Sequence, residues 1–254
     1  MIHLKKLIKL ELRNILKQKS FLICLIISNA LVIIGILASS FLNKMIIEAG
    51  GSEDLFLGVN AFDTYMGYIT GGNITLLLAI VISIYFGSEA SDGTIKNIIA
   101  KGYTRTEFFT SKIISVIFVT LIFILTALIL NYLMCFIMGI NINAFSLKHL
   151  IQIGSASLSI LAETIMFSAL SFIIFKTGAN IVANICIPLL LPLALTLLDV
   201  LSKSKIKVSD FWIETTTTLS RDTSKIPVIL IVSTCYIIVF ILLSSILTKR
   251  KEIK

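Results

Sequence analysis

The sequence predicts an all-α membrane protein that crosses the bilayer with six transmembrane helices. Of its 254 residues, 57% are hydrophobic and only 14% are charged, and the mean hydropathy is +1.00. Soluble domains average about 45–50% apolar and about 25% charged residues. The apolar residues also form long uninterrupted runs, which favour spanning helices over the short alternating segments of a transmembrane β-barrel.

Six apolar runs are each long enough to cross a bilayer, since a spanning helix takes about 20 residues. We predict these spans at Phe21–Leu42, Tyr65–Phe86, Ile113–Gly139, Leu150–Phe175, Ile181–Leu201 and Pro227–Leu247. They make one transmembrane domain over residues 1–254, with loops at 87–112 and 202–226.

The segment 1–20 precedes the first span and has an amphipathic helical pattern. Its apolar face is Leu4, Leu7, Ile8, Leu12 and Ile15, and its basic face is Lys5, Lys6, Lys9, Arg13 and Lys17. Such a helix lies in the plane of the lipid headgroups. A signal peptide is the alternative, but its apolar run is only about 7–15 residues long, and the run that begins at Phe21 is longer.

Basic residues set the predicted orientation. Most of the 22 lysines and arginines fall in the segments 1–20, 87–112 and 248–254. Cytoplasmic loops carry such an excess, so both termini and the 87–112 loop are predicted to be cytoplasmic and the 202–226 loop extracytoplasmic. The net charge of +8 fits anionic headgroups. Without aromatic residues among the basic ones, we expect no nucleic-acid partner.

Glu163 lies midway along the fourth predicted span, where a charge is costly unless it faces protein or water. It belongs either to a substrate path or to an interhelical hydrogen bond, and Ser155, Ser159 and Ser171 near the same face favour close helix packing. Pro188 and Pro192 predict a kink in the fifth span, which starts beside Asn184. Together, Glu163, Asn184, Pro188 and Pro192 form a candidate translocation path.

The sequence shows no sign of catalytic machinery. It has no phosphate-binding GxxxxGK[ST] loop, no HExxH and no GxSxG motif. The four cysteines are scattered through apolar runs, and the two histidines lie far apart in the sequence. We therefore expect no catalytic residue, no metal site and no cofactor bound by this chain.

The loop between the second and third spans, "FGSEASDGTIKNIIAKGYTRTEFF", carries two helix starts. Ser91 or Asp92 can cap a short helix that Gly102 ends. Its apolar face is Ile95, Ile98 and Ile99, at i, i+3 and i+4. Periodicity leaves open whether this face lies on lipid or in a groove of a partner protein.

A second helix start follows at Thr104, where "TRTE" has the spacing of a capping box. Thr104 is the N-cap and Glu107 the third helical residue, so a helix is predicted to run from there into the third span. Lys112 is expected to extend along this helix to the headgroups.

The stretch "EASDGTIKNIIAKGYTRTEFFTSK" resembles the corresponding loop of type 2 ABC transporter permeases. In that family a glutamate, a Gly-Thr pair, a base, an arginine and a lysine recur between the second and third helices. The matching residues here are Glu89, Gly93, Thr94, Lys96, Arg105 and Lys112. The usual Pro-Ile or Pro-Val pair before the arginine is replaced by Tyr103-Thr104. The interfacial helix and six spans also agree with the family.

This resemblance implies a permease subunit of an ATP-driven exporter in a bacterial cell membrane. A separate cytoplasmic ABC ATPase would bind ATP and Mg²⁺, and it would dock on the short coupling helix. The implied coupling residues are Glu89, Gly93, Thr94, Ile95, Lys96, Ile98, Ile99 and Arg105. A second copy or a sister permease would complete the path.

Small permeases of this kind most resemble those that export, or give immunity to, amphipathic antimicrobial peptides or hydrophobic compounds. Two other functions remain open from the residues. One is a secondary transporter coupled to an ion through Glu163, and the other is a peptide-immunity membrane protein that does not transport.

Overall fold

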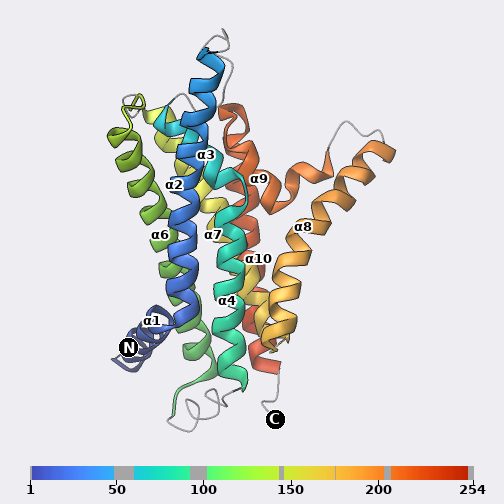
Figure 1. The fold of residues 1–254 in the computed structure, drawn as a ribbon. Helices are drawn as coiled ribbons and strands as arrows, with labels where there is room; N and C mark the ends of the chain where they lie inside the picture. Colours follow the sequence, from blue (N-terminus) through green and yellow to red (C-terminus); the bar gives the residue numbers. More distant parts are fainter. Residues whose placement is uncertain are drawn as a thin grey trace.

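Long helices make up almost all of the described chain (Figure 1). The structure is a computed structural model, and it describes residues 2–48, 60–91, 102–142, 146–174, 176–202 and 207–250. Its helices are α1 (Ile2–Lys17), α2 (Lys19–Glu48), α3 (Ala61–Thr70), α4 (Asn73–Ser91), α6 (Arg105–Ile137), α7 (Leu147–Ile174), α8 (Thr177–Ser202), η2 (Val208–Phe211), α9 (Ile213–Leu219), η3 (Thr223–Lys225) and α10 (Ile226–Arg250). These residues contain no strand, so the predicted all-α class is confirmed.

Five helices are long and apolar enough to cross a membrane: α2, α6, α7, α8 and α10. Helices α3 and α4 pass the same test only together, and they meet at an angle of 45°. The prediction of six spans agrees with the structure when this bent pair counts as one. The second span, predicted at Tyr65–Phe86, is therefore formed by two helices. It breaks at Gly71 and Gly72, where Gly72 has a φ of +75° that favours glycine.

Helical structure extends further into the predicted 87–112 loop than the hydropathy pattern indicates. Helix α4 continues to Ser91, and α6 begins at Arg105, directly after the predicted N-cap Thr104 and eight residues before the predicted span at Ile113. Polar residues in the first turns of α6 mark the point where a hydropathy window stops, but they do not stop the helix. Residues 92–101, between the end of α4 and Gly102, lie outside the described residues.

Helix α7 lies at the centre of the bundle. In its most apolar stretch 67% of residues are buried, against 11% for α8. It contacts α4, α6, α8, α9 and α10. Figure 1 shows the C-terminal half of α8 leaning away from the other helices. This half follows Pro188 and Pro192, both of which lie inside the continuous helix.

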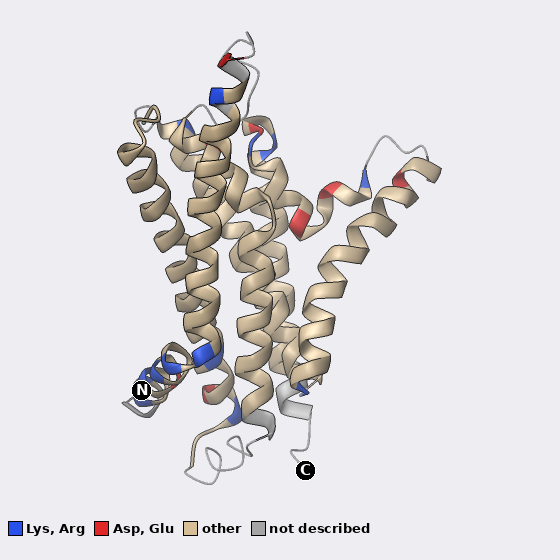
Figure 2. Cartoon of the chain, viewed as in Figure 1, with Lys and Arg blue, Asp and Glu red and all other residues tan. Residues whose placement is uncertain are grey.

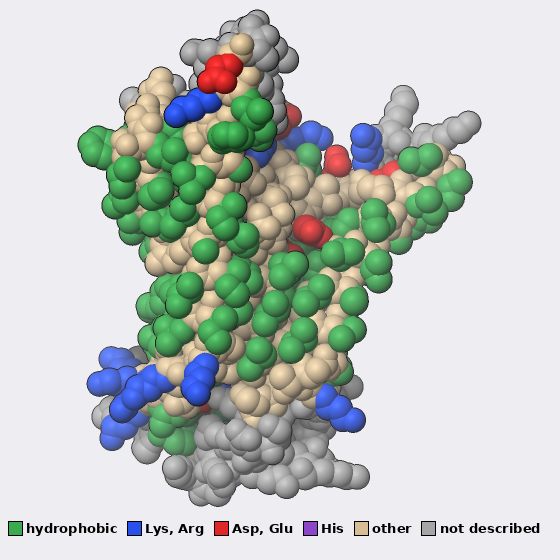
Figure 3. All heavy atoms as spheres, in the orientation of Figure 1, with side chains coloured by type: hydrophobic (Ala, Val, Ile, Leu, Met, Phe, Trp, Pro, Cys, Tyr) green, Lys and Arg blue, Asp and Glu red, His purple; other side chains and the backbone are tan. Residues whose placement is uncertain are grey.

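The two ends of the bundle differ in charge. The start of α1 and the end of α10 lie at the same end (Figure 1), and Figure 2 shows that lysine and arginine residues gather on α1 at that end. We call it the basic end. Between the two ends, Figure 3 shows a belt of hydrophobic side chains over the visible face. This belt is the surface that a bilayer covers, so the chain is a membrane protein.

The contact between α4 and α8 is close enough to require glycine at position 87. A Cβ added to Gly87 would lie 2.3 Å from Thr177 Oγ1 and 2.5 Å from the Thr177 Cα. Because one of these atoms belongs to the backbone, the helices themselves would have to move apart. Two residues in the same helices, Ser83 and Asn184, are joined by a 2.8 Å hydrogen bond from the Asn184 amide.

We predict that Gly87→Ala destabilises the protein by about 1–3 kcal/mol, the usual cost of overpacking a filled interior. Gly154→Ala is the matched control, because a Cβ added to Gly154 meets no atom within 4 Å. Thermal unfolding in detergent measures both variants. Equal unfolding temperatures for the two variants would contradict the close contact.

Candidate functional site

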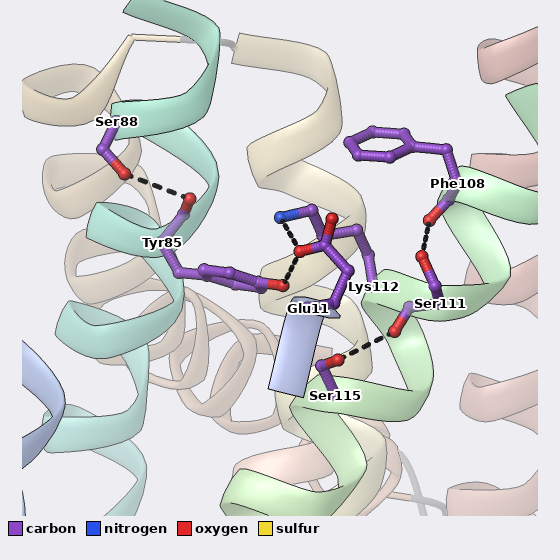
Figure 4. Close-up of polar contacts among 7 residues, drawn as sticks. All are labelled: Glu11, Tyr85, Ser88, Phe108, Ser111, Lys112 and Ser115. Atoms are coloured by element: carbon purple, nitrogen blue, oxygen red, sulfur yellow. Dashed lines mark hydrogen bonds and ion pairs between the residues drawn. The ribbon is translucent and has the colours of Figure 1, made fainter. Parts of the chain in front are cut away.

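A fully buried ion pair joins three helices at the basic end (Figure 4). The Lys112 ammonium on α6 lies 2.8 Å from Glu11 Oε2 on α1, and both side chains are fully buried. The hydroxyl of Tyr85 on α4 donates a 2.5 Å hydrogen bond to the same carboxylate oxygen. The ammonium also lies 3.6 Å from the centre of the Tyr85 ring, which is a cation–π contact. One glutamate oxygen thus connects α1, α4 and α6.

Local sequence explains how Glu11 reaches this position. Leu7, Glu11 and Ile15 follow one another at intervals of four, so they share one face of α1, and all three are buried. The basic side chains Lys5, Lys6, Lys9, Arg13 and Lys17 are exposed. Glu11 therefore lies within the apolar face of the helix and points at the bundle.

The expectation that Lys112 extends to the headgroups is wrong. Its side chain is fully buried because α1 packs over the start of α6 and supplies a carboxylate for it. The rings of Phe86 and Phe108 lie 5.8 and 5.4 Å from the ammonium and help to enclose it. Removing one partner of a buried ion pair leaves an uncompensated charge, which costs about 3–5 kcal/mol.

The capping box at the start of α6 is confirmed. The Glu107 amide donates to Thr104 Oγ1 at 3.2 Å, and the Thr104 amide donates to Glu107 Oε2 at 2.9 Å. Gly102 has a φ of +86°, a left-handed backbone conformation that favours glycine. Arg105 is the first residue of α6 and is half-buried.

Most of the predicted coupling residues cannot be placed. Glu89 lies in the last turn of α4. Gly93, Thr94, Ile95, Lys96, Ile98 and Ile99 lie outside the described residues. The structure does place the two helix ends that flank them. Glu11, Tyr85 and Lys112, which we call the Glu11 cluster, join α4 and α6 near these ends.

Three of the four predicted path residues line one cavity of about 170 Å³. Glu163 of α7 and Asn184 and Pro188 of α8 lie on its wall, together with the Gly71–Gly72 break. Pro192, one turn further along α8, is not among the lining residues. Neither carboxylate oxygen of Glu163 has a hydrogen-bond partner among the described residues, although the side chain is only 1% exposed. An interhelical hydrogen bond therefore does not account for Glu163.

The serines near Glu163 do join helices, as their pattern predicts. Ser159 of α7 lies 3.0 Å from the Ser233 hydroxyl of α10 and accepts a 3.2 Å hydrogen bond from Thr216 of α9. Ser171 accepts a 3.1 Å hydrogen bond from the Asn184 amide. These contacts hold α7 against its neighbours on both sides of Glu163.

Sequence reasoning missed two functional candidates, Glu11 and Glu214. Glu214 of α9 lines the same cavity as Glu163, and burial raises its pKa. Trp212, just before α9, is buried. Its ring packs edge-on against the ring of Tyr236 on α10, with 6.3 Å between the ring centroids. A tryptophan near a membrane face is expected to anchor at the interface. Here it instead packs inward and fixes α9 over the cavity.

No group of three His, Cys, Asp or Glu side chains within the described residues is placed to hold a metal ion. The four cysteines, all within the described ranges, form no disulfide. The polar chemistry that these residues offer is therefore carboxylate, amide and hydroxyl.

Comparison with known families gives one clear match. The family described as "ABC-2 family transporter protein" matches residues 7–199, which is most of the chain. The matched range starts on the buried face of α1 and ends within α8, so it includes both the Glu11 cluster and Glu163. No curated protein gives a significant match to the chain.

We predict that Glu11→Gln and Lys112→Met each destabilise the protein by about 3–5 kcal/mol, because each leaves a buried charged or polar partner unsatisfied. The double variant should lose much less than the two single losses combined, since no unpaired charge remains. Unfolding in detergent at increasing denaturant measures this cycle.

Lys9→Met serves as the control, because Lys9 is exposed on the opposite face of α1 and should cost little. Simple additivity of the Glu11 and Lys112 effects would show that the two side chains do not interact.

Proposed function

The chain belongs to the ABC-2 family of transporter proteins, and we propose that it is the membrane-spanning permease subunit of an ATP-driven exporter. The match to that family over residues 7–199 carries the proposal. The family is a transport component of membranes and is not itself catalytic. This agrees with a sequence that has no phosphate-binding motif.

A separate cytoplasmic ATPase is proposed to bind ATP and Mg²⁺ and to dock on the loop between α4 and α6. Ile95, Ile98 and Ile99 would insert into a groove of that subunit, with Glu89 and Arg105 at the two ends of the loop. The basic end would then face the cytoplasm, together with both termini. The excess of lysine and arginine at this end supports that orientation (Figure 2).

The Glu11 cluster suggests how a movement of the docked loop reaches the membrane. The loop is attached to α4 on one side and to α6 on the other, and Tyr85 and Lys112 bind these two helices to one carboxylate oxygen of α1. A push on the loop would move the ends of α4 and α6 together with α1. With 33 residues, α6 is about 50 Å long and would carry this displacement across the bilayer.

A second copy or a sister permease is proposed to complete the path in a bacterial cell membrane. Helix α8 supports this, because its outer face exposes large apolar residues and its C-terminal half leans away from the bundle. The proposed cargo is an amphipathic or antimicrobial peptide or a hydrophobic compound. The transporter would export this cargo, or give the cell immunity to it.

We predict that Ile98→Asp combined with Ile99→Asp abolishes both co-purification with the ATPase and export. A charge on the docking face would be buried without a partner at the interface. Thr110→Asp, at an exposed position in the second turn of α6, adds a negative charge and should leave both intact. If the ATPase still binds and export continues in the double variant, the docking proposal is wrong.

We predict that export stops when the partner ATPase is unable to hydrolyse ATP. Transport that instead follows a proton gradient and is lost in Glu163→Gln would identify an ion-coupled secondary transporter. Protection against a peptide that persists with the inactive ATPase would identify an immunity protein that does not transport.

A further inference from the structure

The cavity beside the Gly71–Gly72 break brings together polar groups from four helices. Glu163 comes from α7, Glu214 from α9 and Asn184 from α8, while Asn73 and Thr75 lie in the first turn of α4. No lysine, arginine or histidine is among the described residues that line it. The two glutamates therefore face the cavity without a cation from its wall.

The buried carboxylate of Glu163, unpaired among the described residues, is the main indication that this cavity binds a ligand. Its side chain is 1% exposed, and neither of its oxygens has a hydrogen-bond partner among the described residues. The Asn184 side chain is equally buried, and its Oδ1 is also without a partner there. An ionised carboxylate accepts hydrogen bonds and donates none, as does an amide oxygen. Three buried acceptor atoms of this cavity thus have no donor bound to them among the described residues.

Glu214 adds a second carboxylate at the rim of this cavity. Its Oε1 lies 3.9 Å from the position that a Cβ on Gly72 would take, so the carboxylate sits at the helix break. Its Oε2 is buried without a hydrogen-bond partner. The start of α4 at Asn73 directs the positive end of a helix dipole toward the same region, which lessens the cost of holding two carboxylates there.

We propose that this cavity binds the cationic head of an amphiphile, a primary ammonium or a guanidinium group, between Glu163 and Glu214. Such a group supplies several donors to the acceptors on the wall. The rest of the wall is apolar and includes Leu76, Phe167, Ile185 and Leu189. Charged and apolar surfaces side by side fit a molecule with a cationic head and a hydrocarbon chain.

Size and access agree with this occupant. A cavity of about 150 Å³ holds a benzene ring, so 170 Å³ has room for an ammonium head and its first methylenes. A metal ion fits less well, since Ca²⁺ takes 6–8 oxygen ligands and Mg²⁺ keeps an octahedral shell. Figure 3 shows acidic side chains in the notch between the leaning half of α8 and the other helices.

Binding of the cation is independent of the proposed export, whereas its role as cargo rests on that function. The test therefore uses the purified chain in lipid nanodiscs without any ATPase. The probes are radiolabelled dodecylammonium and its uncharged counterpart, dodecanol. Binding of each is measured at equilibrium for the unsubstituted chain, Glu163→Gln, Glu214→Gln and the control Glu48→Gln. Glu48 ends α2 and lies outside the cavity.

We expect Glu163→Gln and Glu214→Gln each to weaken dodecylammonium binding by about tenfold or more, the size of one lost hydrogen bond to a charged group. Glu48→Gln should bind it as tightly as the unsubstituted chain. Dodecanol binding should not change in any variant. Glutamine has nearly the shape of glutamate, and Glu163 has no hydrogen bond within the described structure to lose, so thermal unfolding should not shift downward.

Two results would overturn the proposal. Dodecylammonium affinities within about twofold of the unsubstituted chain in both cavity variants, with folding intact, would show that the carboxylates do not hold the cation. Equal losses for dodecanol and dodecylammonium would show an apolar site without charge recognition. Ile98→Asp with Ile99→Asp should leave binding unchanged, so a failure of ATPase docking is separable from a failure of this site.

Discussion

The ion pair between Glu11 and Lys112 fixes the basic end of the molecule. A charge removed from water is tolerated only with a close partner, and here each charge is the other's partner at 2.8 Å. Tyr85 shares the same carboxylate oxygen, so α1, α4 and α6 have one permitted arrangement at this point. Because α4 and α6 are the two helices that enter and leave the proposed docking loop, the base of that loop is set by a single carboxylate.

Local features of the sequence predicted the spans and the start of α6. Hydropathy is a property of a short window, and a bilayer demands about 20 apolar residues, so α2, α6, α7, α8 and α10 are visible in the sequence. The capping box was equally local, since Thr104 and Glu107 are three residues apart. The proposed docking face at Ile95, Ile98 and Ile99 has the same kind of local evidence and stays a prediction.

Features that depend on residues far apart were missed. Glu11 looked like one polar residue in an amphipathic helix, and its partner is a hundred residues away in the sequence. Lys112 was expected to reach water because the sequence does not show that α1 covers it. The Gly71–Gly72 pair is visible in the sequence. Because the residues on both sides of it are apolar, the hydropathy pattern predicts one continuous span and misses the break. Glu214 joins Glu163 only through the placement of α9.

The contents of the cavity at the helix break determine the local dielectric constant around Glu163 and Glu214. A space of this size with carboxylate and amide oxygens on its wall is polar and roomy enough for several water molecules. Water in the cavity would screen Glu163 from Glu214. An occupant that displaces this water dries the surroundings of the charges it contacts, and a Coulomb interaction strengthens as the dielectric constant falls. Displacement of water and strong binding of the occupant are therefore coupled. Return of water to the cavity would raise the dielectric constant again and weaken the binding.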